Sequence, residues 1–299
     1  MRCPRINRVR QDKPASEADY IEKPSRPCSL LNESLATSAC MPNSETVTRY
    51  VLIIVAIGQF IAPLLPTALG IGQDIGEAAR ADHGGYPPEQ PLSVAFSIWG
   101  VIFTLYALFA VISLRRSDET IRRVGPPLAI AGALNIIWML NAQIVNLQLL
   151  NFALLFPIAW YATRAAAAFE TVRDTGADLT KFTADAVTGL LCGWITVAIS
   201  ISMPVTVRII SGLGASDAPW QMLILTLTTA AAGAWAFSTF IGRNAWYFVA
   251  LGWGVACVAL NNWFVTQMHP MALATLCIGL VIVRQGLRHD DNMESRTYE

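Results

Sequence analysis

The feature that most constrains the fold is a succession of apolar runs that begins just after Arg49. Each run is long enough, as a helix, to cross about 30 Å of hydrocarbon. Only 14% of the residues are charged, whereas soluble domains carry roughly 25%. The runs lie at 50–72, 92–114, 127–147, 149–168, 186–208, 220–241, 245–266 and 270–287. The sequence therefore predicts an all-α, polytopic transmembrane helical bundle of about eight spans, the third and fourth joined as a tight hairpin.

The distribution of Lys and Arg supports this count independently. Cytoplasmic loops of membrane proteins collect positive charge. With eight spans, 19 of the 21 Lys and Arg fall on one side of the membrane, and Arg80 and Arg208 fall on the other. This bias predicts that both termini are cytoplasmic.

The two ends of the chain differ from the spans. Residues 1–48 are rich in Ser, Pro, Arg and Glu, and such a segment cannot bury a core, so it is predicted to be a disordered polar tail. Met41 offers an alternative start that would leave most of this tail out. Residues 288–299 form a second polar tail, expected to be cytoplasmic. Neither of the longest loops, 73–91 and 170–184, is long enough to hold a soluble catalytic domain.

The composition argues against several function classes. The formal net charge is zero, so no nucleic acid is expected as a partner. The predicted spans have no carboxylate in their cores, Asp185 being at an end, which weighs against an ion-coupled transporter. His83, His269 and His289 lie in loops or the tail, and the six cysteines show no metal-ligand spacing. The sequence therefore predicts no metal site and no enzyme.

Aromatic residues form a stripe along the second span. Phe96, Trp99, Phe103 and Tyr106 are spaced by three, four and three residues, which places them on one face of a helix at about 100° per residue. One interpretation is a surface for packing against other helices. The other is one wall of a site for a flat, apolar ligand.

The third span is rich in side-chain amides around a tryptophan. Asn135, Trp138 and Asn141 lie on one side of the expected helix, and this side cannot face lipid without a cost in free energy. Hydrogen bonds between helices, worth about 0.6 kcal/mol each, are one explanation. Gln148 and Asn151 fall where the chain must turn, so they are assigned to the turn. Asn135, Trp138 and Asn141 are assigned to an interior site.

Three stretches of the chain resemble the TspO/MBR family, the tryptophan-rich sensory proteins related to the peripheral benzodiazepine receptor. The similarity is greatest to the longer bacterial members with extra C-terminal spans. The matching residues are Pro91, Phe96, Trp99, Leu105 and Tyr106 in the second span, Leu134, Asn135 and Trp138 in the third, and Trp194 and Ala198 in the fifth. The resemblance implies a five-helix membrane bundle over 49–210 and three additional transmembrane helices over 219–287. It also implies a bacterial inner (plasma) membrane as the location.

The resemblance further implies a flat hydrophobic ligand, porphyrin-like or sterol-like, held within the bundle by a sensor, carrier or sink. The ligand-binding residues expected are Phe96, Trp99, Tyr106, Asn135, Trp138, Asn141 and Trp194. The loop 73–91, with Gly84, Gly85, Pro87 and Pro88, is expected to act as a lid.

The partners expected are the lipid bilayer, a hydrophobic small molecule and a second copy of the chain in a homodimer. A porphyrin or haem-like tetrapyrrole would be bound as the ligand, and no other cofactor is expected. Two alternatives stay open: a facilitator for a small neutral solute, and a structural membrane subunit without a ligand.

Overall fold

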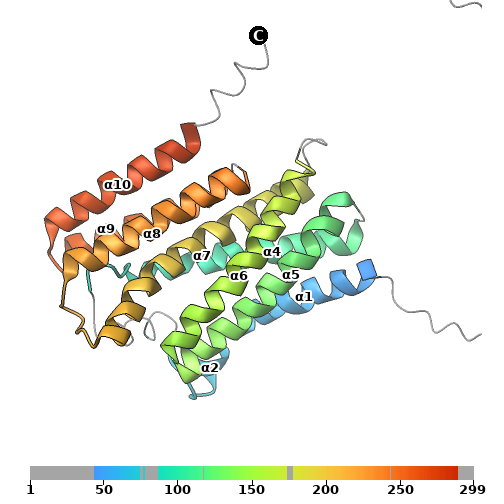
Figure 1. The fold of residues 1–299 in the computed structure, drawn as a ribbon. Coiled ribbons are helices and arrows are strands. Elements are labelled where there is room, and N and C mark those ends of the chain that lie inside the picture. The colour runs from blue at the N-terminus through green and yellow to red at the C-terminus, as the bar shows by residue number, and fades with distance from the viewer. Residues whose placement is uncertain are drawn as a thin grey trace, which may run out of the picture. The chain divides into compact units, whose positions relative to one another are not determined.

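The computed structural model describes residues 44–74, 77, 87–116, 118–173, 178–242 and 244–288. The described ranges are helical, with no strand among them (Figure 1). The predicted tails lie outside the described residues, apart from 44–48 and Arg288. Residues 44–48 already belong to the first helix, so that part of the expected tail is helical.

Eight long helices lie in the order that the apolar runs predict. They are α1 (Ser44–Ile61), α4 (Ile98–Arg115), α5 (Glu119–Leu140), α6 (Gln148–Glu170), α7 (Leu179–Ser211), α8 (Pro219–Phe240), α9 (Ala245–Phe264) and α10 (His269–Arg288). Within the described ranges, three short elements accompany them: α2 (Leu65–Ala68), the 3-10 helix η1 (Ser93–Ser97) before α4, and the π-helix η2 (Asn141–Val145) after α5.

Six of these helices, α4 to α9, are long and apolar enough to cross a membrane. This confirms the prediction of a polytopic helical membrane protein. The part of α10 whose side chains are described, His269–Arg284, is shorter than the six, and α1 is not among them. The crossings by α1 and α10 therefore remain predictions, although both segments are helical.

The helix bounds depart from the apolar runs at several ends. The first helix ends at Ile61 instead of continuing to residue 72, because Pro63 and Pro66 follow and a proline cannot continue the backbone hydrogen-bond ladder. At the other end of the bundle, Asp118 and Asp178 accept hydrogen bonds from the backbone amides of Ile121 and Lys181, both at 2.9 Å. These N-caps start α5 and α7 several residues before their apolar runs begin.

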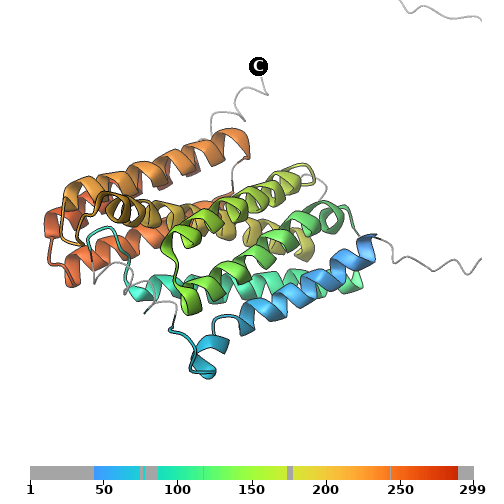
Figure 2. The same ribbon diagram turned by 60° about the horizontal axis from the view of Figure 1, so that its bottom comes forward.

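Helix α7 joins two groups of helices. It contacts α4, α5 and α6 on one side and α8 and α9 on the other, while α1 packs on α4 and α5, and α10 packs on α8 and α9 (Figures 1 and 2). Of the three additional helices, α8 and α9 thus pack directly on α7, and α10 packs on those two. The approach of α9 to α7 depends on glycine, because a Cβ at Gly193 would overlap the carbonyl oxygen of Tyr247.

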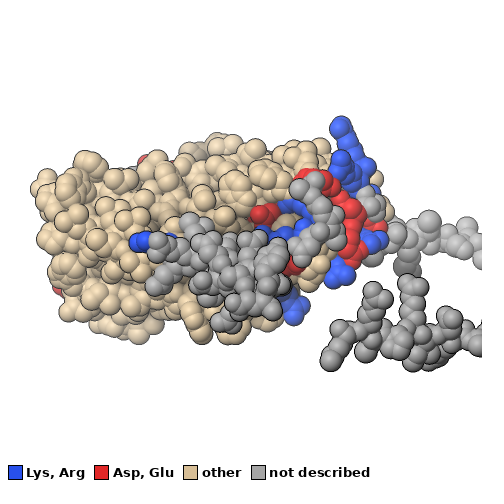
Figure 3. Space-filling view, turned by 90° about the horizontal axis from the view of Figure 1, so that it is seen from above, with Lys and Arg blue, Asp and Glu red and all other residues tan. Residues whose placement is uncertain are grey.

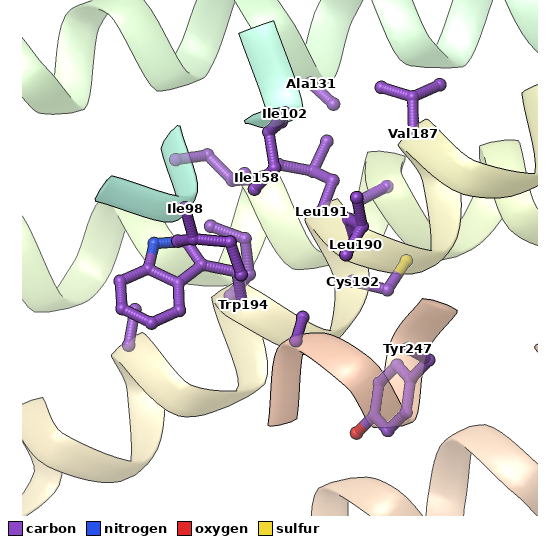
Figure 4. Packing of buried hydrophobic residues seen from close by; sticks show 14 of the residues in the cluster. Ile98, Ile102, Ala131, Ile158, Val187, Leu190, Leu191, Cys192, Trp194 and Tyr247 are labelled. Atoms are coloured by element: carbon purple, nitrogen blue, oxygen red, sulfur yellow. The ribbon is translucent and has the colours of Figure 1, made fainter. Parts of the chain in front are cut away.

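The hydrophobic core surrounds α7, which is the most buried of the six apolar helices. Figure 4 shows Trp194 and Leu191 of α7 among side chains from the neighbouring helices, such as Ile98 of α4 and Ile158 of α6. Helix packing of this kind brings residues from distant parts of the chain to the same depth of the bundle.

Charged side chains gather at one end of the bundle. Figure 3 shows Lys, Arg, Asp and Glu together at that end of the face in view, while most of the remaining described surface carries other residues. Arg116 binds Asp178 at 3.1 Å across the α4–α5 and α6–α7 connections, and Arg173 binds Asp185 at 3.1 Å. The described basic residues of the predicted cytoplasmic side therefore lie at a common end, as the eight-span interpretation requires.

Candidate functional site

Five aromatic residues meet where α4, α5 and α7 come together, and we refer to Phe96, Trp99, Phe103, Trp138 and Trp194 as the aromatic cluster. Trp99 is its centre. The ring of Trp99 lies 5.4 Å from that of Phe103, 6.1 Å from that of Trp138 and 6.1 Å from that of Trp194, measured between centroids. Phe96 meets Trp194 edge to face at 6.0 Å. Aromatic pairs of this geometry contribute about 0.5–1.5 kcal/mol each beyond the area that they bury.

The local structure of each element explains this convergence. Phe96 lies in η1 and Trp99 in the first turn of α4, so the change from 3-10 to α-helix occurs within the site. Trp138 lies in the last turn of α5, and Trp194 lies near the middle of α7. The structure therefore brings together four of the seven residues predicted to bind a ligand: Phe96, Trp99, Trp138 and Trp194.

Asn135, another of the seven residues predicted to bind a ligand, is fully buried one helical turn before Trp138. Its Nδ2 reaches only the sulfur of Met139, at 3.8 Å, and a thioether is a weak acceptor. Its Oδ1 has no hydrogen-bond partner among the described residues. An unsatisfied buried polar group costs about 1–3 kcal/mol, so this amide is poorly explained as a bond between helices.

Two indole nitrogens of the cluster also lack a hydrogen-bond partner within the described part of the chain. Trp99 Nε1 and Trp138 Nε1 are both buried and have no acceptor among the described residues. With Asn135 Oδ1, the site thus holds two unpartnered donors and one unpartnered acceptor beside apolar rings. Buried polar groups are paired in the large majority of cases, and three of the nine unpartnered buried side-chain atoms among the described residues belong to Trp99, Asn135 and Trp138.

Tyr106 lies apart from the cluster, farther along α4. Its hydroxyl donates to the carbonyl oxygen of Leu128 at 3.3 Å, and a Cβ at Gly132 would come within 2.9 Å of that hydroxyl. Tyr106 therefore packs α4 against α5, and the stripe that begins at Phe96 serves two purposes along its length.

The hydrogen bonds of Asn141 lead to the hairpin and not to the aromatic rings, so its expected role in a ligand site stays a prediction. Its Nδ2 donates to Asn151 Oδ1 at 2.5 Å and to the carbonyl oxygen of Leu147 at 3.5 Å. These bonds close the hairpin between α5 and α6. Asn141 therefore belongs with Asn151, which the sequence had already assigned to the turn.

Gln143 is one of the amides of this span to which the sequence assigned no role, yet it joins two parts of the chain. Its Nε2 donates to the carbonyl oxygens of Ala62 at 3.3 Å and Met139 at 3.1 Å. The backbone carbonyl oxygen of Gln143 accepts a hydrogen bond from the backbone amide of Gln73 at 3.1 Å. The amides of this span thus fix a hairpin and the end of α1, in addition to lining the site at Asn135.

The expected lid is described only in part. Residues 75, 76 and 78–86, with Gly84 and Gly85, lie outside the described residues. Pro87 and Pro88 are described, and their carbonyl oxygens accept hydrogen bonds from Asn261 and Asn262 of α9. Within the described ranges, no group of three or more His, Cys, Asp or Glu side chains is placed to hold a metal ion.

The chain matches no curated protein and no solved structure at a significant level. The family model described as TSPO-like protein matches residues 49–286. This match begins near the start of α1 and continues through the three helices that follow residue 219. Together with the helical membrane bundle, a match over most of the sequence shows that the chain belongs to the family of TSPO-like proteins.

Proposed function

We propose that this TSPO-like membrane protein binds a flat, largely apolar ligand of the porphyrin or sterol type at the aromatic cluster, as a sensor, carrier or sink. The observation that carries the proposal is the set of three buried polar atoms without partners beside the rings: Trp99 Nε1, Trp138 Nε1 and Asn135 Oδ1. Ligand pockets combine apolar and aromatic walls with a few polar groups that orient the ligand.

The chemistry of these groups favours a tetrapyrrole over a sterol. A porphyrin such as protoporphyrin offers a flat face for stacking on Trp99 and Trp138, and two propionic acid side chains that can hydrogen-bond with the indole N–H donors and the amide of Asn135. A sterol has a single hydroxyl to satisfy the same three atoms. Because the rings contact one another directly, binding requires them to move apart, as interface side chains commonly do.

Fluorescence titration tests this proposal on the purified full-length protein in detergent micelles. Protoporphyrin IX is expected to quench the tryptophan emission saturably, because indole rings of the cluster would lie against the ligand. A sterol is expected to act more weakly. Empty micelles with free tryptophan correct for absorption by the porphyrin. Quenching that rises linearly for both compounds, without saturation, would contradict the proposal and favour a structural subunit.

We further propose that the charged end of the bundle faces the cytoplasm, in a bacterial inner membrane. The support is the gathering of basic residues at that end, since cytoplasmic loops retain Lys and Arg. Reporter fusions after Ser117 are expected to give a cytoplasmic signal, and fusions after Ser216 an exterior one. A cytoplasmic signal after Ser216 would mean that the number of crossings before it is wrong.

A further inference from the structure

The segment 87–95, which leads into the aromatic cluster, is held along its length by α9. Four hydrogen bonds join them: Asn261 Nδ2 to the Pro87 carbonyl oxygen at 3.1 Å, Asn262 Nδ2 to that of Pro88 at 2.7 Å, the Leu92 amide to the Cys257 carbonyl oxygen at 3.2 Å, and Trp253 Nε1 to that of Ala95 at 3.0 Å. Residues 253, 257 and 261 are four apart, so they share one face of the helix.

Two of the side chains that make these bonds are amides buried inside the bundle, which costs free energy. Asn261 and Asn262 are both 0% exposed, and a buried amide is unfavourable unless it is paired. On the segment, the carbonyl oxygens of Pro87 and Pro88 obtain the donors that an irregular backbone lacks inside a bundle. Asn261 and Asn262 each donate to this segment, although Asn261 Oδ1 has no partner among the described residues.

The segment is fixed from α7 as well. Glu89, which is 0% exposed, accepts from Arg208 Nε at 3.0 Å. The backbone on either side of Glu89 is therefore bonded to α9 and its side chain to α7. Such a segment has little freedom to change the angle at which the chain enters η1.

We infer that α9 acts as a clamp, through Trp253, Asn261 and Asn262, that positions Phe96 and Trp99 for ligand binding. Phe96 directly follows Ala95, the last clamped residue, and Trp99 is the second residue of α4, the helix that the segment leads into. The clamp itself depends only on these contacts, whereas its effect on affinity rests on the function proposed above. This gives the three-helix extension a role at the site of the five-helix part.

Hydrogen–deuterium exchange on the full-length protein tests the clamp without any ligand. The variant Asn261→Leu/Asn262→Leu removes two donors and keeps similar bulk, so amides in 87–97 are expected to exchange about 5- to 50-fold faster. Trp253→Phe, which removes one donor and keeps an aromatic ring, is expected to give about a 2- to 10-fold increase. Trp263→Phe, on an exposed part of the same helix, should leave 87–97 unchanged.

Protoporphyrin IX titration then tests the positioning role. The double variant is expected to bind about 3- to 10-fold more weakly than the wild type, as a coupling between separate sites allows. Faster exchange without a loss of affinity would overturn the positioning role. Unchanged exchange in 87–97, or an equal increase throughout α4, α7 and α9, would overturn the clamp. If the wild type does not bind the porphyrin, the proposed function fails, while the exchange experiment still decides the clamp.

Discussion

Arg208→Leu is expected to lower the free energy of unfolding by about 3–5 kcal/mol, because it leaves a buried carboxylate without its counter-charge. Arg208 is 6% exposed and Glu89 is 0% exposed, and Arg208 Nε lies 3.0 Å from Glu89 Oε1. The same guanidinium donates to the carbonyl oxygens of Gly214 and Asp217. The substitution therefore releases both the segment before α4 and the loop between α7 and α8.

Two variants separate charge burial from general disruption. Arg122→Leu removes an exposed partner of Glu119, and exposed pairs contribute about 0–1 kcal/mol. Glu89→Leu/Arg208→Leu removes both buried charges and should recover part of the stability lost in Arg208→Leu. Tryptophan fluorescence during unfolding in mixed micelles measures all three. If Arg208→Leu costs no more than Arg122→Leu, the ion pair does not support this end of the bundle.

The helices could be predicted because apolar length is a local property of the sequence. Runs of about twenty apolar residues have few other folds available in a bilayer, and the described helices follow these runs. The ends were less predictable, since they depend on single residues. Pro63 ends α1 early, and Asp178 caps α7 before its apolar run begins.

The amides of α5 show what a helical wheel leaves open. A helical wheel turns by about 100° per residue, and on that basis Asn141 belongs with Asn135 and Trp138. The chain changes to a π-helix over Asn141–Val145, and its wider turn shifts the residues after Asn141 from the positions that the wheel gives them. Asn141 donates to Asn151 of the next helix, a contact that a wheel of one helix cannot show.

Contacts between distant residues could not be predicted at all. Asn261 and Pro87 are 174 positions apart, and Arg208 and Glu89 are 119 apart. No periodicity in the sequence connects such pairs. Arg208 was visible only as a basic residue on the less basic side of the membrane, and its burial against a carboxylate emerged from the packing of α7 against the segment before α4.

The aromatic cluster could be predicted from the sequence only in part. The stripe on α4 was visible as spacing, but spacing cannot tell a ligand wall from a packing surface. The structure divides the stripe: Trp99 contacts three rings of the cluster, whereas Tyr106 bonds the backbone of α5. The resemblance to the TspO/MBR family supplied Trp194, and the fold places it beside Trp99.

Substitutions in the aromatic cluster are expected to weaken protoporphyrin binding strongly. Stacking of a flat ligand on an aromatic ring contributes about 1–3 kcal/mol in nucleic-acid-binding proteins. By that measure Trp138→Leu or Trp99→Leu should raise the dissociation constant about 5- to 100-fold. Leucine preserves apolar bulk, so the bundle should still form. Trp220→Leu, at an exposed position on α8, is the matched control and should leave binding unchanged.

Asn135→Leu separates a binding site from a bond between helices. Because Asn135 Oδ1 has no partner among the described residues and Nδ2 meets only a sulfur atom, its removal should leave thermal stability unchanged or raise it. The porphyrin would lose a polar contact, so its affinity should fall. A bond between helices predicts the opposite result, namely lower stability with unchanged affinity. That outcome, or equal effects of Trp138→Leu and Trp220→Leu on titration, would exclude the aromatic cluster as the ligand site.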